Sequence, residues 1–292
     1  MRSLFIFFLI PLLAMGEEFT FLAYNVRNYL ESDSFRDGKK VGTRYKPEQE
    51  ISALSAIIVE AAPDVIGICE IGTEADLKDL QSRLKSQGSD YPYTEHLDGA
   101  DSVRRLALLS KHPIKKSYSR HDLTYFIGAD EFPVRRGLLH VELDFNGVSL
   151  HAVGLHLKSK RPSQNYDQAE MRLKEADACK DYLNSFLESH PEAKLFLYGD
   201  LNDTYKSPPV NILKGYYESP HYLRPLNLSD SRGEHWTHYW DYERQYSVFD
   251  YVLCNRSLLP LVNKQKSHIL DQENVMKASD HRPLLVTFSL KD

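Results

Sequence analysis

The stretch from residue 136 to residue 159, RGLLHVELDFNGVSLHAVGLHLKS, restricts the possible folds more than any other part of the sequence. Two runs of alternating apolar and polar residues flank Asn146 and Gly147. An Asn-Gly pair between such runs predicts a hairpin with a two-residue turn. A hairpin makes its strands antiparallel, so a purely parallel, doubly wound sheet is excluded.

Hydrophobic periodicity locates the other expected elements. Strands are predicted at 19–26, 64–71, 104–114, 194–200, 235–240, 247–255 and 281–290. Helices are predicted at 47–62, 73–88 and 165–190, and the segment before residue 233 is rich in loops. Strands therefore outnumber helices, and some strands form hairpins. We infer an α/β fold with two mixed β-sheets packed face to face and helices outside.

The first 16 residues, MRSLFIFFLIPLLAMG, have the pattern of a signal peptide. Arg2 precedes an apolar block, and Ala14 and Gly16 provide small residues before a cleavage point. The block is too short to span a bilayer, which disfavours the alternative of a retained anchor. We expect an exported protein, periplasmic or secreted, whose residues 17–292 form one catalytic domain without a transmembrane segment.

Charge and cysteine content limit the functional classes. The formal net charge is −5, and loss of Arg2 makes it −6, so the strongly basic balance of many nucleic-acid-binding proteins is absent. The three cysteines, Cys69, Cys179 and Cys254, cannot all pair within one chain, and their spacing suits no zinc site. We expect none of them to be catalytic.

Polar residues stand at or near the ends of the predicted strands. One such residue would indicate a turn, but several in one chain predict a shared rim where many strands stop. Their carboxylate and amide oxygens favour Mg²⁺, Mn²⁺ or Ca²⁺, and a histidine with a carboxylate partner is a positioned acid, base or oxyanion stabiliser. The residues are Asn25, Glu70, His156, Asp200, Asn202, Asp250, Asp280 and His281.

These residues lie in motifs that resemble the endonuclease/exonuclease/phosphatase superfamily, the deoxyribonuclease I-like metal-dependent phosphoesterases. The motifs occur in the family's order along the chain, and the resemblance covers residues 17–292. It implies a four-layered α/β sandwich, which agrees with the two sheets inferred above. The motifs are YNVRNY, ICEI, ALLSKHPI, GLHLKS, GDLND, FDYVL and SDHRPLLV.

The resemblance also implies roles for these residues. Glu70 matches the principal metal ligand, with Asn25 beside it. Asp280 matches an aspartate that in some members belongs to a second metal site or supports the metal ligands. Asp200 matches the carboxylate that orients or deprotonates the attacking water, and Asn202 the amide that binds the phosphate. His281 matches the histidine on the scissile phosphate. Two further catalytic matches are Asp250, which orients that histidine, and His156, the proposed general acid.

The substrate is less well defined by the sequence. Arg104, Arg105 and Lys158 are candidates for binding substrate phosphates. Trp236 and Trp240 would share one face of a strand, either as a platform for base stacking or as part of an aromatic core strand beside residues 247–255.

We expect a metal-dependent phosphodiesterase and, within this class, a nuclease acting on DNA or RNA. The alternatives are a phosphatase or sphingomyelinase-like hydrolase of small or lipid phosphoesters, and an inactive binding domain. The cofactor is expected to be Mg²⁺ or Mn²⁺, with Ca²⁺ as another option. No protein partner is indicated, and we expect a monomer.

Overall fold

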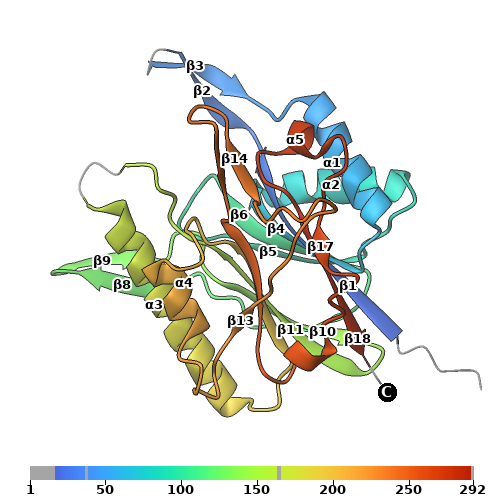
Figure 1. The fold of residues 1–292 in the computed structure, drawn as a ribbon. Coiled ribbons are helices and arrows are strands. Elements are labelled where there is room, and N and C mark those ends of the chain that lie inside the picture. Colours follow the sequence, from blue (N-terminus) through green and yellow to red (C-terminus); the bar gives the residue numbers. More distant parts are fainter. Residues whose placement is uncertain (1–16, 37–38, 163–165, 291–292) are drawn as a thin grey trace, which may run out of the picture.

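The computed structural model describes residues 17–36, 39–162 and 166–290. The predicted signal peptide lies outside the described residues. In the described part of the chain, no helix has the length and apolar character needed to cross a membrane. Two six-stranded sheets make up the centre of the molecule, with helices on the outer face of each (Figure 1).

The first sheet has the strand order β17-β18-β1-β4-β6-β5. Strands β1 and β4 are parallel, whereas the other neighbouring pairs are antiparallel. The sheet is therefore mixed, as the sequence predicts. Its members are β1 (Glu17–Tyr29), β4 (Val65–Ile71), β5 (Tyr93–Leu97), β6 (Arg105–Ser110), β17 (His268–Ile269) and β18 (Leu284–Leu290).

The second sheet has the order β13-β16-β12-β11-β10-β7 and is also mixed, because only β11 and β12 run parallel. The predicted hairpin joins β10 to β11, and Asn146 and Gly147 at its turn have φ values of 48° and 88°. The members are β7 (Ile114–Ser117), β10 (Leu139–Phe145), β11 (Val148–His156), β12 (Leu195–Asp200), β13 (Arg224–Pro225) and β16 (Asp250–Cys254).

Helices cover the outer faces of both sheets, which gives the four layers that the sequence predicts (Figure 1). The first sheet carries α1 (Glu48–Ala61), α2 (Glu74–Ser86) and α5 (Val275–Ala278), and the second carries α3 (Gln168–Ser189) and α4 (Pro208–Lys214). A capping box at Thr73 and Asp76 begins α2. The remaining elements are a 3₁₀ turn, η1 (Leu259–Leu261), and three small hairpins: β2 (Ser32–Arg36) with β3 (Lys39–Arg44), β8 (Thr124–Ile127) with β9 (Asp130–Pro133), and β14 (His238–Trp240) with β15 (Gln245–Ser247).

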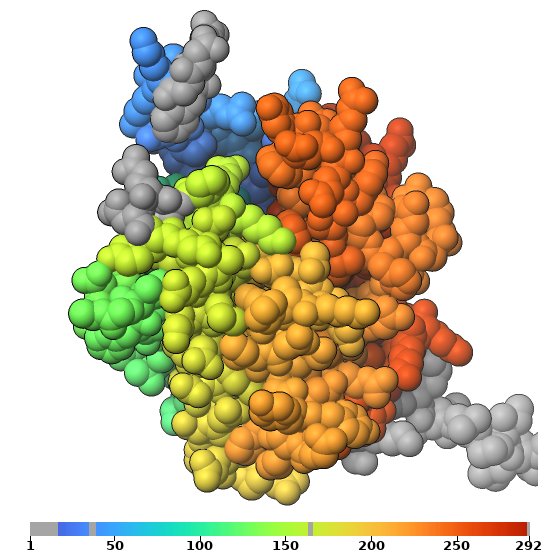
Figure 2. Space-filling view, turned by 60° about the vertical axis from the view of Figure 1, so that its left-hand side comes forward, coloured from blue at the N-terminus to red at the C-terminus, as the bar shows by residue number. Residues whose placement is uncertain are grey.

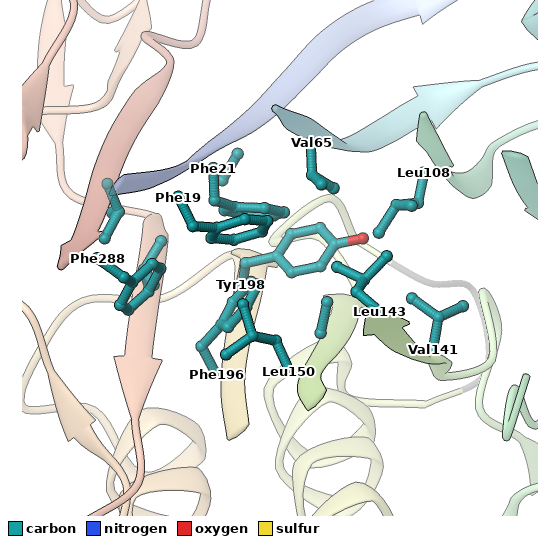
Figure 3. Packing of buried hydrophobic residues seen from close by; sticks show 14 of the residues in the cluster. Phe19, Phe21, Val65, Leu108, Val141, Leu143, Leu150, Phe196, Tyr198 and Phe288 are labelled. Atoms are coloured by element: carbon teal, nitrogen blue, oxygen red, sulfur yellow. The ribbon is translucent and has the colours of Figure 1, made fainter. Parts of the chain in front are cut away.

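Apolar residues fill three layers, one between the sheets and one under each set of helices. The alternation along β1 shows why: Phe19 and Phe21 face the other sheet, whereas Leu22 faces the helices. Figure 3 shows Phe21 packed between the sheets against Phe196 and Tyr198 of β12. The sheets are thereby fixed against each other, which fixes the relative positions of their strand ends.

A buried histidine pair lies under α3. His140 Nε2 is 3.2 Å from His151 Nδ1, and His140 Nδ1 is 2.7 Å from the Tyr182 hydroxyl. Burial, together with the neighbouring His151 and His190, lowers the pKa of His140 to about 3, and burial also lowers the pKa of His151. The folded protein therefore holds these imidazoles in their neutral form.

We predict that stability falls as the pH drops below about 6.5. Between the unfolded pKa near 6.5 and the folded value near 3, the unfolded chain binds more protons, so acid favours unfolding by about 1.4 kcal/mol per pH unit for His140. Urea unfolding at several pH values measures this slope. His140→Leu should flatten it, whereas exposed His121→Leu should not. An unchanged slope in His140→Leu would contradict the assignment.

Candidate active site

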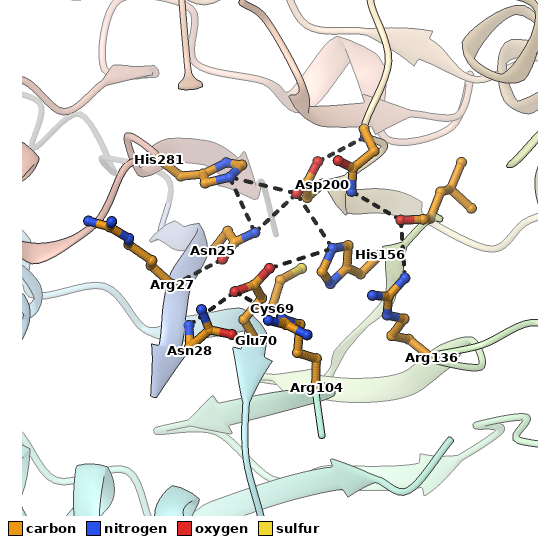
Figure 4. Close-up of polar contacts among 12 residues, drawn as sticks. Asn25, Arg27, Asn28, Cys69, Glu70, Arg104, Arg136, His156, Asp200 and His281 are labelled. Carbon is orange, nitrogen blue, oxygen red and sulfur yellow. Dashed lines mark hydrogen bonds and ion pairs between the residues drawn. The ribbon is translucent and has the colours of Figure 1, made fainter. Parts of the chain in front are cut away.

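The predicted polar residues converge where strands of both sheets end. Asn25 and Glu70 come from β1 and β4 of the first sheet, and His156 and Asp200 end β11 and β12 of the second (Figure 4). The pairing register places His156 beside Asp200, and Asp200 beside Asp250 at the start of β16. Polar groups separated by up to about 250 residues in the sequence therefore form one cluster.

Asp200 is the centre of this cluster and is almost completely buried. Its Oδ2 accepts a hydrogen bond of 3.0 Å from Asn25 Nδ2 and lies 3.6 Å from His156 Nε2 and 3.8 Å from His281 Nε2. Its Oδ1 accepts the backbone N–H of Asn202 at 2.8 Å. One carboxylate thus touches four of the predicted site residues.

His281 forms an ion pair with Asp250, with 2.8 Å between Nδ1 and Oδ2. Burial alone would lower the pKa of His281, but Asp250 and Asp200 outweigh it and raise this pKa to about 10. The ring is therefore an imidazolium at neutral pH. Its Nε2 points toward Asp200 and Asn25, so the cluster contains a fixed positive charge.

Asp200 and His156 have shifted pKa values for different reasons. Burial raises the pKa of Asp200 to about 7, although the His281 cation partly offsets this. Burial holds the pKa of His156 well below its usual range, and the cations Arg136, His281 and Arg104 lower it further. At neutral pH the cluster thus combines an imidazolium, a neutral imidazole and a carboxyl group close to its titration point.

Glu70 reaches the cluster because β4 bulges at this residue. The register shifts between Cys69 and Ile71, and Glu70 has a φ of 67°. Arg27 and Asn28 on the neighbouring strand have φ values of 48° and 54°. Left-handed conformations are costly for such residues and often occur at functional sites. They let Asn28 donate its backbone N–H to Glu70 Oε2 at 3.0 Å.

The oxygens of Glu70 and Asn25 could hold a divalent cation. Glu70 is the more accessible group, and its Oε1 lies 3.9 Å from His156 Nε2. Carboxylate and amide oxygens suit hard cations such as Mg²⁺. Asp200, Asp250 and His281 also bring ligand atoms within 4.8 Å of one another. We favour Glu70 and Asn25 as the cation ligands, because a cation bound by Asp200, Asp250 and His281 would have to displace the proton on His281.

Asn202 and Arg136 are joined through the carbonyl oxygen of Leu157. Asn202 Nδ2 donates to it at 3.0 Å, and Arg136 Nη1 donates at 3.4 Å (Figure 4). The preceding strand tolerates no side chain at Gly199, where a Cβ would lie 1.9 Å from the carbonyl oxygen of Leu155. This close approach lets β12 deliver Asp200 and Asn202 beside His156.

Some of the predicted residues lie outside the cluster or are occupied elsewhere. Asp280 pairs with Arg27 at 3.5 Å, and Arg105 pairs with Asp98. Lys158 is buried, and its Nζ donates to two backbone carbonyl groups, those of Ser159 and Arg161. Arg104, by contrast, lies in the cluster, with its Nε 3.6 Å from Glu70 Oε2.

The two tryptophans also differ in their environments. Trp236 precedes β14, donates its indole N–H to Glu234 and lies over the guanidinium of Arg282, 4.0 Å from the ring centre. Trp240 is exposed and belongs to the β14–β15 hairpin, not to a core strand. The predicted shared face therefore does not form a continuous row.

Thr237 is a site residue that the sequence analysis missed. Its hydroxyl accepts the backbone N–H of Asp250 at 3.0 Å, and its carbonyl accepts that of Arg282 at 2.6 Å. It therefore holds the backbone of Asp250 and that of Arg282, the residue after His281. The ring of His238 also lies 4.6 Å from that of His281, between centroids. The sequence feature that could have identified Thr237 and His238 is their position in the last polar segment before Asp250.

The three cysteines, Cys69, Cys179 and Cys254, are buried and free. Cys69, next to Glu70, donates to the carbonyl oxygen of Leu155 at 3.6 Å, and burial raises the pKa of its thiol.

Comparison with known proteins identifies the family and the fold. Residues 30–281 match the model of the Endonuclease/Exonuclease/phosphatase family. Truncated TDP2 from Caenorhabditis elegans has a TM-score of 0.63 at 17% identity, covering 94% of this chain and 98% of that one. TDP2 from D. rerio, complexed with a single-strand DNA product, has a TM-score of 0.61 at 18% identity, covering 94% and 99%.

Sphingomyelinase C from Streptomyces griseocarneus has a TM-score of 0.55 at 16% identity, covering 93% of this chain and 99% of that one. No curated protein sequence matches the chain significantly. The matches to solved structures support the fold, and the family model spans most of the chain. The chain therefore belongs to the endonuclease/exonuclease/phosphatase family of metal-dependent phosphoesterases.

Proposed function

We propose that this protein is an exported, divalent-metal-dependent phosphodiesterase that hydrolyses nucleic acid. The observation that carries the proposal is the arrangement around Asp200, which has Asn25, His156 and the His281–Asp250 ion pair around one carboxylate. Export rests on the pattern of residues 1–16, and we assign residues 17–292 to one catalytic domain.

Asp200, His281 and His156 divide the chemistry among them. Asp200, with a pKa of about 7, accepts a proton from the attacking water as a new P–O bond forms. The His281 imidazolium, oriented by Asp250, faces the phosphate and stabilises the charge that develops on its oxygens. His156 is placed to give a proton to the leaving oxygen when the opposite P–O bond breaks.

The neutral state of His156 is compatible with this role once substrate binds. The nearby cations Arg136 and Arg104 contribute to its low pKa. A bound phosphodiester brings a negative charge between these groups, which favours protonation of the imidazole. Asn202, held by Asp200 and the Leu157 carbonyl oxygen, is placed to contact the phosphate and the water.

Glu70 and Asn25 are the residues that would hold the cation. Asp280 is linked to them indirectly, through its ion pair with Arg27. A bound Mg²⁺ or Mn²⁺ would neutralise phosphate charge. The protein supplies the orientation: Asn28 fixes one oxygen of Glu70, and the backbone N–H of Arg27 fixes Asn25 Oδ1 at 3.0 Å.

A second candidate function is hydrolysis of a lipid phosphodiester. The β14–β15 hairpin, which reaches the site through the pairing of His238 with His281, carries three exposed aromatic residues. Trp240, Tyr242 and Tyr246 are 50%, 84% and 59% exposed. Such a patch suits either stacked bases or the surface of a bilayer.

Parallel assays separate the two functions. The protein is incubated with plasmid DNA, single-stranded oligonucleotides, sphingomyelin vesicles and a bis-aryl phosphodiester, with Mg²⁺ or Mn²⁺ added. We expect hydrolysis of nucleic acid and of the aryl diester. Turnover of vesicles alone would favour the lipid function, and no turnover of any substrate would favour an inactive binding domain.

We predict that EDTA abolishes activity, that Mg²⁺ or Mn²⁺ restores it, and that Glu70→Ala weakens Mg²⁺ binding at least tenfold. The reason is that Glu70 would contribute the main charged ligand. Isothermal calorimetry measures the binding directly, with Glu60→Ala on the exposed face of α1 as the control. Unchanged Mg²⁺ affinity in Glu70→Ala would remove Glu70 from the metal site.

A further inference from the structure

Basic residues gather on one side of the site, the side of His156. Some are buried and some reach the surface, where they form what we call the basic rim: Arg104, Arg135 and Lys160, whose side chains are 26%, 44% and 49% exposed. Three buried cations support the rim from below, and they are Arg136, Lys158 and Arg172.

Two of the three buried cations are paired with carboxylates. Arg136 lies 3.1 Å from Asp101, and Arg172 lies 2.9 Å from Asp203. Two members of the rim pair with the same two carboxylates as the buried cations. Arg135 lies 3.8 Å from Asp101, and Lys160 lies 3.1 Å from Asp203. Asp101 and Asp203 therefore each pair with two cations. In each of these two groups, one positive charge remains uncompensated.

The other two carboxylates on this side do not remove the excess. Glu175 is buried and accepts the backbone N–H groups of Arg135 and Lys158, at 3.0 and 2.6 Å. Glu70 pairs with Arg104 but is the proposed cation ligand. Among the described residues named here, six cations thus face four carboxylates, an excess of two positive charges in a chain of net charge −5.

The opposite side of the site has the reverse charge. In the segment 232–246, Glu234, Asp241 and Glu243 are exposed, and the accompanying arginines are Arg244 and Arg232, which lies 3.8 Å from Glu234, so one negative charge remains in excess. Figure 2 shows a hollow between the yellow-green segment after β11 and the orange β14–β15 region. A polyanion that reaches the site is therefore attracted to the His156 side and repelled from the hairpin side.

We infer that the basic rim binds the phosphate groups next to the scissile one, on the leaving-group side, so that the preferred substrate is a strand with consecutive phosphodiesters. This inference rests on the proposed function and deepens it. Lys160 lies 5.2 Å from the centre of the Phe249 ring, which adjoins Asp250, so the rim begins beside the catalytic cluster. An isolated phosphodiester would leave the rim unused.

The test compares two substrates. The double variant Arg135→Ala/Lys160→Ala should raise KM for a single-stranded oligonucleotide about tenfold and leave kcat within twofold, because the lost contacts act on binding. Its kinetics on a bis-aryl phosphodiester should be unchanged. Arg244→Ala, on the opposite side, should not weaken oligonucleotide binding. Equal losses on both substrates, or no loss on the oligonucleotide, would overturn the inference.

A binding measurement keeps this result separate from the proposed reaction. Fluorescence anisotropy with a labelled oligonucleotide in EDTA needs no turnover. Two phosphate contacts predict a slope of log K against log salt that is shallower by about 1.4 in the double variant. The same slope in wild type and variant would overturn the inference. Normal salt-dependent binding without any nucleic-acid hydrolysis would instead contradict the proposed function alone.

Discussion

Replacing Asp200 with asparagine should lower kcat by a factor on the order of 10²–10⁴ without making the protein less stable. Asparagine cannot accept a proton from water, so the proposed base is lost. The change nevertheless keeps the size of the side chain and an oxygen that can accept a hydrogen bond from Asn25 or Asn202. Activity and stability should therefore separate in this variant.

The stability side follows from the pKa of Asp200. Burial raises this pKa to about 7, whereas the unfolded value is near 3.8. A carboxyl group whose folded pKa is raised contributes stability that is lost as the pH rises from about 4 to about 7. The ionised group is thus a net cost above pH 7, although the His281 cation reduces that cost. Asparagine removes it.

Steady-state kinetics and urea unfolding at pH 8 test the two predictions for Asp200→Asn together, the loss of kcat and the unreduced stability. Asp181→Asn on the exposed face of α3 is the matched control, and it should change neither quantity. A folded Asp200→Asn variant with wild-type kcat would show that Asp200 is not the base. A variant that loses activity only because it unfolds would show that the carboxylate holds the site together.

The layers of the fold could be predicted from the sequence because strand patterning is a local signal. Alternation around Asn146 and Gly147 specified an antiparallel hairpin, and the structure confirms it. The small hairpins β2–β3 and β8–β9 were missed, because β3 is exposed along its whole length and the strands of β8–β9 have four residues each, too few to show a clear period. The predicted strand 235–240 became a three-residue strand, since Trp236 packs on Arg282.

The convergence of the site was also visible in the sequence, since its residues stand at or near the ends of predicted strands, and His156, Asp200 and Asp250 do end or begin strands. What could not be predicted is where each side chain points. Glu70 depends on a bulge and a left-handed backbone, and Lys158 turns inward to carbonyl groups near a buried Glu175. Thr237 holds Asp250 through its hydroxyl, a contact that exists only after the two segments have packed. Each depends on tertiary contacts.

The two histidines should respond differently to the leaving group. His281→Ala removes a cation that faces the phosphate, so it should lower kcat/KM by a factor on the order of 10²–10³ on any phosphodiester. His156→Ala removes the proposed proton donor. An alkoxide leaving from nucleic acid needs a proton, whereas a nitrophenolate does not. His156→Ala should therefore lose on the order of 10²–10⁴ on an oligonucleotide and much less on a bis-nitrophenyl phosphodiester.

The comparison also separates catalysis from folding. His281→Ala leaves the buried Asp250 carboxylate without its partner, so some loss of stability is expected, and His281→Gln provides a neutral donor in its place. The low exposure of His156 makes circular dichroism of each variant a necessary check. If folded His156→Ala lost equal factors on both substrates, His156 would be a group that binds phosphate or positions Asp200, 3.6 Å away, and the proton for the leaving oxygen would have to come from water or from His281, the other imidazole that contacts Asp200.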